Sequence, residues 1–269
     1  MNKNSPIGIF DSGVGGFTVI KEILKELPNE SLIYLGDTAR IPYGTRSKGL
    51  ITKFSLEMVS FLLKHQIKFL VVACNTISAT CLKEIQNFSH VPVLGVINPA
   101  AKYAVDITKT QHIGVIGTRA TIASGIYEKE IMNLNPDTKV LSKSCPLFIH
   151  FAEEGFTDHP ALKYVAEDYL KKFTDSKIDT LILGCTHYPL LRDTIQDVVG
   201  KEITLIDSAG PTAKELRKIL AKKNLLSKNK EPEFRFYVTD APERAKEIAE
   251  KFFGEKLPGE LKLTHQFLG

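Results

Sequence analysis

Short apolar runs alternate along the chain with amphipathic segments, and this alternation constrains the fold more than any other feature of the sequence. Strands are predicted near residues 6–10, 31–36, 68–73, 91–97, 112–117, 139–144, 180–184, 203–207 and 233–239. Between several of these runs, apolar residues recur at helical spacing. One such face carries Phe17, Ile20, Leu24 and Leu27. Strands that alternate with helices form βαβ units, so the sequence predicts an α/β fold of mainly parallel sheets flanked by helices.

The two halves of the chain resemble each other in the order and spacing of their motifs. Gly-Ile-Phe-Asp-Ser at residues 8–12 is echoed by Gly-Val-Ile-Gly-Thr at residues 114–118. Each segment ends an expected strand with a hydroxyl residue, and each is followed at a similar distance by a cysteine. We therefore predict two similar lobes with an active site in the cleft between them.

The lobe boundaries are placed at the two points where the chain is expected to cross. A Pro-rich step precedes residue 98, and the segment Asp-Ser-Ala-Gly-Pro at residues 207–211 is read as the return. The first lobe is predicted to comprise residues 1–97 and 209–269. The second lobe is predicted to comprise residues 98–208.

A cysteine stands just beyond an apolar run in each lobe. Ala-Cys-Asn-Thr at residues 73–76 places Cys74 after one expected strand, and Gly-Cys-Thr-His at residues 184–187 places Cys185 after another. Ligands of open α/β sheets bind beyond the carboxyl ends of such strands. A thiol at the start of a helix is also expected to have a lowered pKa. Two matched thiols indicate one proton-transfer group on each side of a site, although buried, inert cysteines are the alternative.

Composition is that of an ordinary soluble globular protein. The chain has 269 residues, of which 43% are hydrophobic and 25% charged, with a net charge of +4. Lys and Arg near the carboxyl end are mixed with Glu, which favours solvated helices over a nucleic-acid surface. The sequence shows no signal-peptide pattern and no apolar run long enough for a bilayer, so we expect a cytoplasmic protein with reduced cysteines.

Several residues near the cysteines are candidates for the same site. The glycine-rich segment at residues 11–16 lacks the dinucleotide fingerprint, and its amides are expected to suit a small carboxylate. Asp11 is either a partner of Cys74 or a helix cap. His187 is either a proton acceptor for Cys185 or a metal ligand, but no second clustered pair of ligands supports a metal. Glu153 either reaches the cleft or is solvated at the surface.

Further candidates lie at strand ends and in one long loop. Tyr43 and Gly44 belong to a loop after an expected strand, where binding elements are common, although a plain turn is the alternative. Hydroxyl and amide groups are expected to bind a carboxylate as charge grows on it. These groups belong to Ser12, Asn75, Thr76, Thr118, Thr121 and Thr186.

Taken together, these segments resemble the glutamate racemases of the aspartate/glutamate racemase family almost from end to end. The matching segments are residues 8–16, Asp37, 42–44, 73–76, 114–118, 145–147 and 184–189. The resemblance implies interconversion of L- and D-glutamate without pyridoxal phosphate or a metal, with D-glutamate supplied to peptidoglycan. It implies a small-molecule substrate, no nucleic-acid or membrane partner, and leaves a homodimer open.

The resemblance also assigns roles to residues. It makes Cys74 and Cys185 the two acid/base groups, with Asp11, Glu153 and His187 as supporting ionisable groups. It places a substrate site around Asp11, Ser12, Tyr43, Gly44, Asn75, Thr76, Thr186 and His187. His-Phe at residues 150–151 departs from the Pro-Leu that is frequent in the family.

Three other functions compete with this interpretation. A racemase of another acidic amino acid, such as aspartate, would use the same chemistry. A non-catalytic carboxylate-binding protein on the same fold is a second alternative, which the presence of both cysteines disfavours. A thiol redox protein is a third, which the absence of a CxxC pair disfavours.

Overall fold

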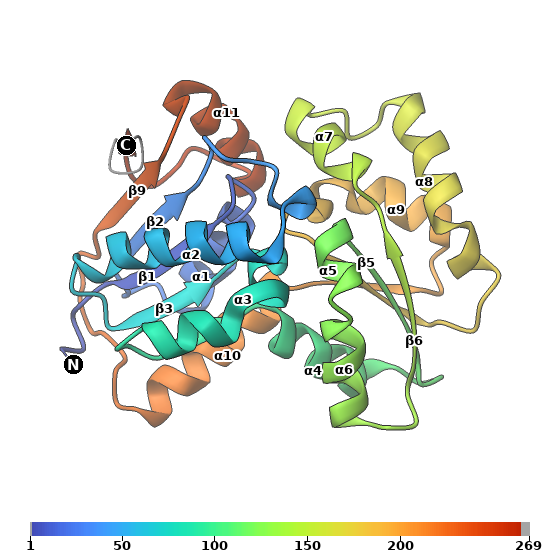
Figure 1. Cartoon of the computed structure of the whole chain (residues 1–269), viewed down its shortest axis with the longest axis horizontal. Helices are drawn as coiled ribbons and strands as arrows, with labels where there is room; N and C mark the ends of the chain where they lie inside the picture. The colour runs from blue at the N-terminus through green and yellow to red at the C-terminus, as the bar shows by residue number, and fades with distance from the viewer. Residues whose placement is uncertain (1, 265–269) are drawn as a thin grey trace.

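The computed structural model describes residues 2–264, which fold into two α/β lobes that lie side by side (Figure 1). The strands are β1 (Ile7–Asp11), β2 (Leu32–Gly36), β3 (Phe69–Val72), β4 (Val93–Gly95), β5 (His112–Gly117), β6 (Lys139–Ser144), β7 (Thr180–Gly184), β8 (Thr204–Asp207), β9 (Phe234–Val238) and β10 (Leu261–Leu263). Every predicted strand region overlaps one of them. β10 was not predicted.

The helices follow the strands in βαβ order. They are α1 (Phe17–Glu26), α2 (Lys48–Leu63), α3 (Asn75–Phe88), α4 (Ile97–Ile107), α5 (Arg119–Ala123), α6 (Ile126–Leu134), α7 (Leu147–Glu154), α8 (Pro160–Thr174), α9 (Arg192–Val199), α10 (Ala209–Lys222) and α11 (Pro242–Phe253), with short 3-10 turns η1 (Tyr43–Thr45) and η2 (Tyr188–Leu191). Within residues 2–264, none of the helices combines the length and apolar character that crossing a bilayer requires.

The two sheets repeat one topology. Strands of the first sheet run in the order β10-β9-β2-β1-β3-β4, and those of the second in the order β6-β5-β7-β8. All neighbours pair in parallel. The segment β2-β1-β3-β4 therefore matches β6-β5-β7-β8 strand for strand. The predicted fold of two similar, mainly parallel α/β lobes is confirmed, whereas the exact boundaries at residues 97/98 and 208/209 stay a prediction.

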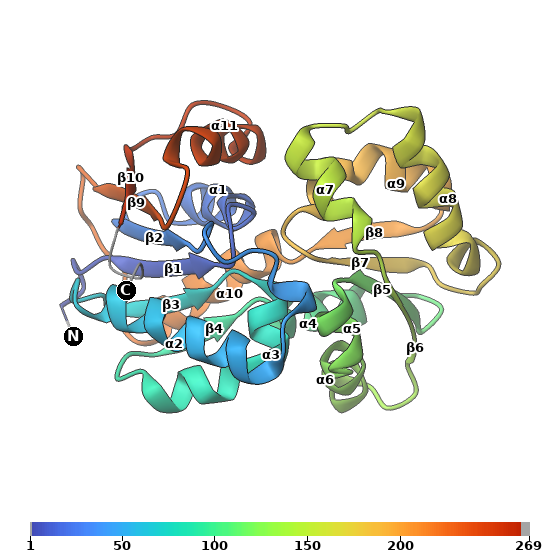
Figure 2. The ribbon, with the colours of Figure 1, turned by 45° about the horizontal axis from the view of Figure 1, so that its top comes forward.

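Alternation along the strands explains why helices cover both faces of the first sheet. Successive side chains of a strand point to opposite faces. Ile7 and Ile9 accordingly join one buried cluster, whereas Phe10 joins the other. In Figure 2, α1 and α11 lie on one side of this sheet and α2 and α3 on the other. Phe88 continues the apolar face of Ile77, Cys81 and Ile85 on α3, yet it is 48% exposed at the end of that helix.

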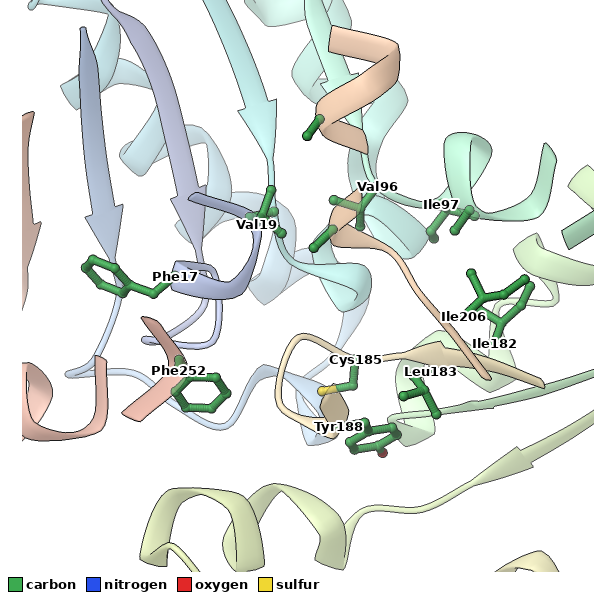
Figure 3. Packing of buried hydrophobic residues seen from close by; sticks show 14 of the residues in the cluster. Phe17, Val19, Val96, Ile97, Ile182, Leu183, Cys185, Tyr188, Ile206 and Phe252 are labelled. Carbon is green, nitrogen blue, oxygen red and sulfur yellow. The ribbon is translucent and has the colours of Figure 1, made fainter. Parts of the chain in front are cut away.

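The larger buried cluster is continuous between the lobes. It contains Phe17 and Phe252 of the first lobe together with Ile182 and Tyr188 of the second (Figure 3). Helix α4 contacts both α10 and β7, so it packs against elements of both lobes. Apolar packing of this kind resists relative displacement, because protein interiors are close-packed. The lobes therefore hold the strand ends that carry Cys74 and Cys185 at a defined separation.

Candidate functional site

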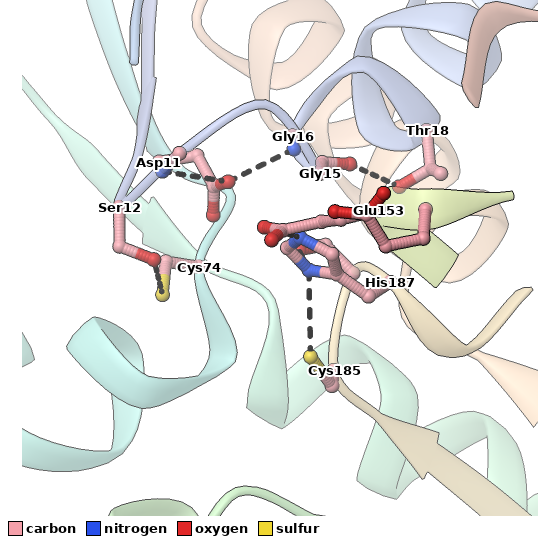
Figure 4. Close-up of polar contacts among 12 residues, drawn as sticks. Asp11, Ser12, Gly15, Gly16, Thr18, Cys74, Glu153, Cys185 and His187 are labelled. Atoms are coloured by element: carbon pink, nitrogen blue, oxygen red, sulfur yellow. Dashed lines mark hydrogen bonds and ion pairs between the residues drawn. The ribbon is translucent and has the colours of Figure 1, made fainter. Parts of the chain in front are cut away.

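A cavity of about 200 Å³ lies where the carboxyl ends of the two sheets face each other. Its lining comes from both lobes. It consists of Ser12, Gly13, Ile41, Pro42, Tyr43, Gly44, Cys74, Asn75, Thr76, Thr118, Ile149, His150, Glu153, Cys185, Thr186 and His187. Cys74 and Cys185 thus open onto one cavity, and Figure 4 shows their sulfur atoms approaching it from different strands.

Cys74 lies between the end of β3 and the first turn of α3. Its sulfur lies 3.3 Å from Ser12 Oγ in a hydrogen bond, and the residue is only 5% exposed. Burial raises the pKa of the Cys74 thiol well above its usual value, and the neighbouring Asp11 raises it further. The expectation of a lowered pKa was wrong for Cys74. Burial and the Asp11 carboxylate outweigh the Ser12 hydroxyl and the helix amide of Ile77.

Cys185 lies just after β7 and has an ionisable partner. Its sulfur lies 3.7 Å from His187 Nδ1, and His187 Nε2 lies 3.1 Å from Glu153 Oε1. Burial alone would lower the pKa of His187, but its interactions with Cys185 and Glu153 raise it to about 10. The same contact lowers the pKa of Glu153 despite partial burial, which acts in the opposite direction. A positive charge is therefore held beside Cys185.

Asp11 holds the glycine-rich segment in place through hydrogen bonds to its amides. Its side chain is fully buried, and Oδ2 accepts hydrogen bonds from the amides of Gly13 and Gly16 at 3.2 and 3.1 Å. Burial raises the pKa of Asp11, while the charge of His187 and these two amides oppose the rise. These two amides are thus occupied by the chain's own carboxylate, which differs from the expectation that they would be open to a ligand.

The glycine-rich segment also touches the second lobe directly. A Cβ atom on Gly15 would lie 2.3 Å from Thr186 Oγ1 and 2.8 Å from His187 Nδ1. Only a glycine lets the backbone approach the His187 ring this closely. The ring of Phe252 on α11 also packs edge-on against His187, with 5.1 Å between ring centroids. The first lobe therefore fixes the imidazole that faces Cys185.

A cluster of three threonines joins the lobes on the other side of the cavity. Thr76 Oγ1 lies 2.9 Å from Thr118 Oγ1, and Thr118 Oγ1 lies 3.0 Å from Thr121 Oγ1. Thr76 belongs to the first lobe and the other two to the second. Thr76 and Thr118 line the cavity, whereas Thr121 is buried beside them. Their hydroxyls can donate hydrogen bonds to a carboxylate.

The loop that carries Tyr43 and Gly44 is tied to the first sheet by Asp37. The Tyr43 hydroxyl donates to Asp37 Oδ2, to which Arg40 Nε also donates at 2.6 Å. Thr239 Oγ1 donates to the other carboxylate oxygen at 2.9 Å. Buried charges require such partners. The network anchors the loop that forms one wall of the cavity.

The structure brings most of the predicted site residues to the cavity wall. Asp11 and Thr121 lie behind the wall. Sequence reasoning missed Gly13, Ile41, Pro42, Ile149 and His150 as lining residues. Helical spacing contained a signal for two of them, because residues 149, 150 and 153 fall on one face of α7. Among residues 2–264, no cluster of His, Cys, Asp and Glu is arranged to hold a metal ion.

Comparisons with known proteins agree with this geometry. Residues 8–216 match the family model described as Asp/Glu/Hydantoin racemase. A glutamate racemase of Syntrophus aciditrophicus is 46% identical over 96% of this chain and 98% of its own length. The structure of glutamate racemase isoform RacE1 from Bacillus anthracis has a TM-score of 0.94 and 43% identity, with 98% of each chain covered.

A solved structure of glutamate racemase from Francisella tularensis, in complex with D-glutamate, is also similar. Its TM-score is 0.92 and its identity is 39%, with 99% of this chain and 100% of that chain covered. The resemblance noted in the sequence is thus confirmed along nearly the whole chain. By its sequence, its fold and its match to the family model, the chain belongs to the Asp/Glu/hydantoin racemase family.

Proposed function

We propose that this enzyme interconverts L-glutamate and D-glutamate by proton transfer at Cα between two cysteines. The observation that carries the proposal is the placement of Cys74 and Cys185, which follow equivalent strands of two similar sheets and line one cavity. Racemisation removes a proton from one face of Cα and returns one to the other face. A single rigid base cannot easily serve both faces, so one group from each lobe suits the reaction.

The two thiols have different neighbours in the cavity. The raised pKa of Cys74 keeps that residue as a thiol, ready to donate a proton. Cys185 instead faces the His187 ring, which is protonated below about pH 10. The family resemblance suggests that Cys185 removes the proton from L-glutamate and Cys74 the proton from D-glutamate, and we propose the same assignment here. After one turnover the cysteine that donated a proton lacks it and the cysteine that removed one carries it. The two must then exchange protons with solvent, or the enzyme catalyses the reverse reaction.

Removal of the Cα proton places negative charge on the α-carboxylate, which hydrogen-bond donors must stabilise. General acid/base catalysis of this kind contributes about 10² to 10⁴-fold, and preorganised donors supply much of the rest. We propose that the hydroxyls and amides of Ser12, Asn75 and Thr186 bind one carboxylate, and those of Thr76 and Thr118 the other. Asp11, Tyr43 and Gly44 complete the proposed site.

Glutamate is proposed as the substrate because the similar enzymes named above are glutamate racemases, and one of them was solved with D-glutamate. We further propose that the reaction takes place in the cytoplasm without a cofactor, and that the D-glutamate formed serves peptidoglycan synthesis. Aspartate is the rival substrate, since it offers the same reacting carbon with a side chain shorter by one methylene.

Comparison of the two amino acids tests this choice. With L-glutamate, circular dichroism is expected to decay to zero as the racemic mixture forms, and kcat/KM with L-aspartate is expected to be lower by about 10² or more. One methylene alone is worth about 10 to 200-fold in a binding pocket, and misplacing the second carboxylate adds to it. Equal rates with both amino acids would contradict the choice of glutamate, and binding without any decay would identify a non-catalytic protein.

A further inference from the structure

One tyrosine outside the proposed substrate site touches the segments that carry both cysteines. Tyr127 belongs to α6 of the second lobe and is 3% exposed. Its hydroxyl donates a hydrogen bond of 2.6 Å to Oδ1 of Asn75. Asn75 directly follows Cys74 and opens α3 in the first lobe. The hydroxyl therefore reaches across the cleft between the lobes to the Cys74 segment.

The ring of Tyr127 packs against the other cysteine segment. A Cβ atom added to Gly184 would lie 3.1 Å from Cε2 of Tyr127 and 2.7 Å from the carbonyl oxygen of Ile116. Gly184 is the last residue of β7 and directly precedes Cys185. The close approach is possible because Gly184 has no side chain. One rigid side chain thus spans the distance between the residue after Cys74 and the residue before Cys185.

The hydrogen bond also fixes the amide of Asn75. With Oδ1 accepting from Tyr127, the amide nitrogen donates to Ser208 Oγ at 3.2 Å. Ser208 stands where the chain enters α10. Burial raises the pKa of Tyr127 far above its usual value, and Cys185 and Asp207 raise it further, so the hydroxyl stays protonated and remains a donor. An amide held at both ends cannot turn its oxygen toward a bound carboxylate.

We propose that Tyr127 is a positioning residue that sets the placement of the Cys74 segment relative to the Cys185 segment, through its hydrogen bond to Asn75 and its packing on Gly184. This role rests on the proposed racemisation. Proton transfer between a sulfur and a carbon requires the reacting atoms to be within about 3 to 3.5 Å, and a displacement of about 1 Å can lower a rate by about 10². A residue that holds two such groups is expected to affect kcat more than KM.

The variant Tyr127→Phe keeps the ring and removes only the hydroxyl. We expect kcat for glutamate racemisation to fall about tenfold in both directions, KM to change by less than about threefold, and Tm to fall by less than about 5 °C. Tyr169→Phe is the matched control. Tyr169 belongs to the same lobe, its ring packs on Phe148, and the substitution likewise removes only a hydroxyl. Its kcat is expected to stay within about twofold of the wild type.

A double variant tests whether the hydroxyl acts through Asn75. Adding Tyr127→Phe to Asn75→Ala is expected to lower kcat by less than about twofold beyond the loss in Asn75→Ala alone, because coupled residues are not additive. An unchanged kcat in Tyr127→Phe, an effect confined to KM, or a full additional loss in the double variant would overturn this role. Absence of racemisation in the wild type would instead overturn the proposed function, and this role with it.

Discussion

Replacement of Cys185 with serine is expected to lower the rate of glutamate racemisation by about 10³-fold or more, and replacement of Cys74 to have an effect of similar size. Each substitution keeps the shape of the side chain but exchanges a thiol for a far less acidic hydroxyl. A serine cannot hold the negative charge that one of the two groups must carry, and loss of a general acid or base costs about 10² to 10⁴-fold. Circular dichroism with L- and D-glutamate measures both directions.

Cys81 offers a matched control within the same lobe as Cys74. It is buried, lies outside the cavity and contacts Ser55 Oγ and the carbonyl oxygen of Ile77 at 3.6 Å each. Cys81→Ser is therefore expected to retain activity within about threefold. A Cys185→Ser protein that still racemised glutamate at a near-normal rate would show that the two-cysteine assignment is wrong.

Replacement of His187 with glutamine is expected to lower kcat/KM by about 10- to 100-fold. The substitution removes the imidazole 3.7 Å from Cys185 and, with it, the positive charge that Glu153 helps to hold. Enantiomers have equal free energies, so kcat/KM must fall by the same factor in both directions. The individual kcat values are free to differ, and we expect the larger loss from L- to D-glutamate, in which Cys185 is the proposed base.

The pH dependence of this effect follows from the pKa of His187. Because this pKa is raised to about 10, the imidazole stays protonated at neutral pH and loses its charge only as the pH rises through about 10. The ratio of wild-type to His187→Gln activity is therefore expected to be constant between about pH 7 and 9 and to decline above 10. A decline centred near pH 6.5, the ordinary value for an imidazole, would contradict the ion pair with Glu153.

Glu153→Gln serves as the companion variant for the same question. It leaves the imidazole in place but removes the carboxylate whose hydrogen bond raises the pKa of His187. In the Glu153→Gln background, the ratio of the activity without His187→Gln to the activity with it is expected to decline at a lower pH than the same ratio in the wild-type background. If Glu153→Gln left the pH profile unchanged, the carboxylate would have no influence on the His187 charge, and the proposed Glu153–His187–Cys185 chain would lose its support.

Much of the fold could be predicted because each strand carries its own signal. The apolar run of residues 180–184 ends at a glycine and is followed by a cysteine, a local pattern that does not depend on the rest of the chain. β10 lacked such a signal, because three residues at the edge of a sheet form a strand only through pairing with β9. Phe88 fits the apolar periodicity of its helix but lies on the last turn of α3, beyond the cover of its neighbours.

The candidate site was predictable where its residues follow strands, and not where they come from helices. Cys74, Thr118 and Cys185 each stand just after a strand, so the parallel topology places them at the carboxyl ends of the strands in the two sheets. Ile149, His150 and Tyr127 reach the cavity or its supports only through tertiary packing, of α7 against η2 and α8 and of α6 against α4 and β6. The pKa of Cys74 was likewise out of reach, because burial and the Asp11 charge depend on the folded chain.

Racemisation of L-glutamate in heavy water tests the two-cysteine account most directly. Because Cys185 is proposed to remove the Cα proton and Cys74 to deliver a deuteron equilibrated with solvent, the D-glutamate formed in the first few per cent of conversion should carry deuterium at Cα. The remaining L-glutamate should retain its hydrogen. D-glutamate that kept the original hydrogen, or L-glutamate that gained deuterium as fast as the product, would indicate a single base and contradict the account.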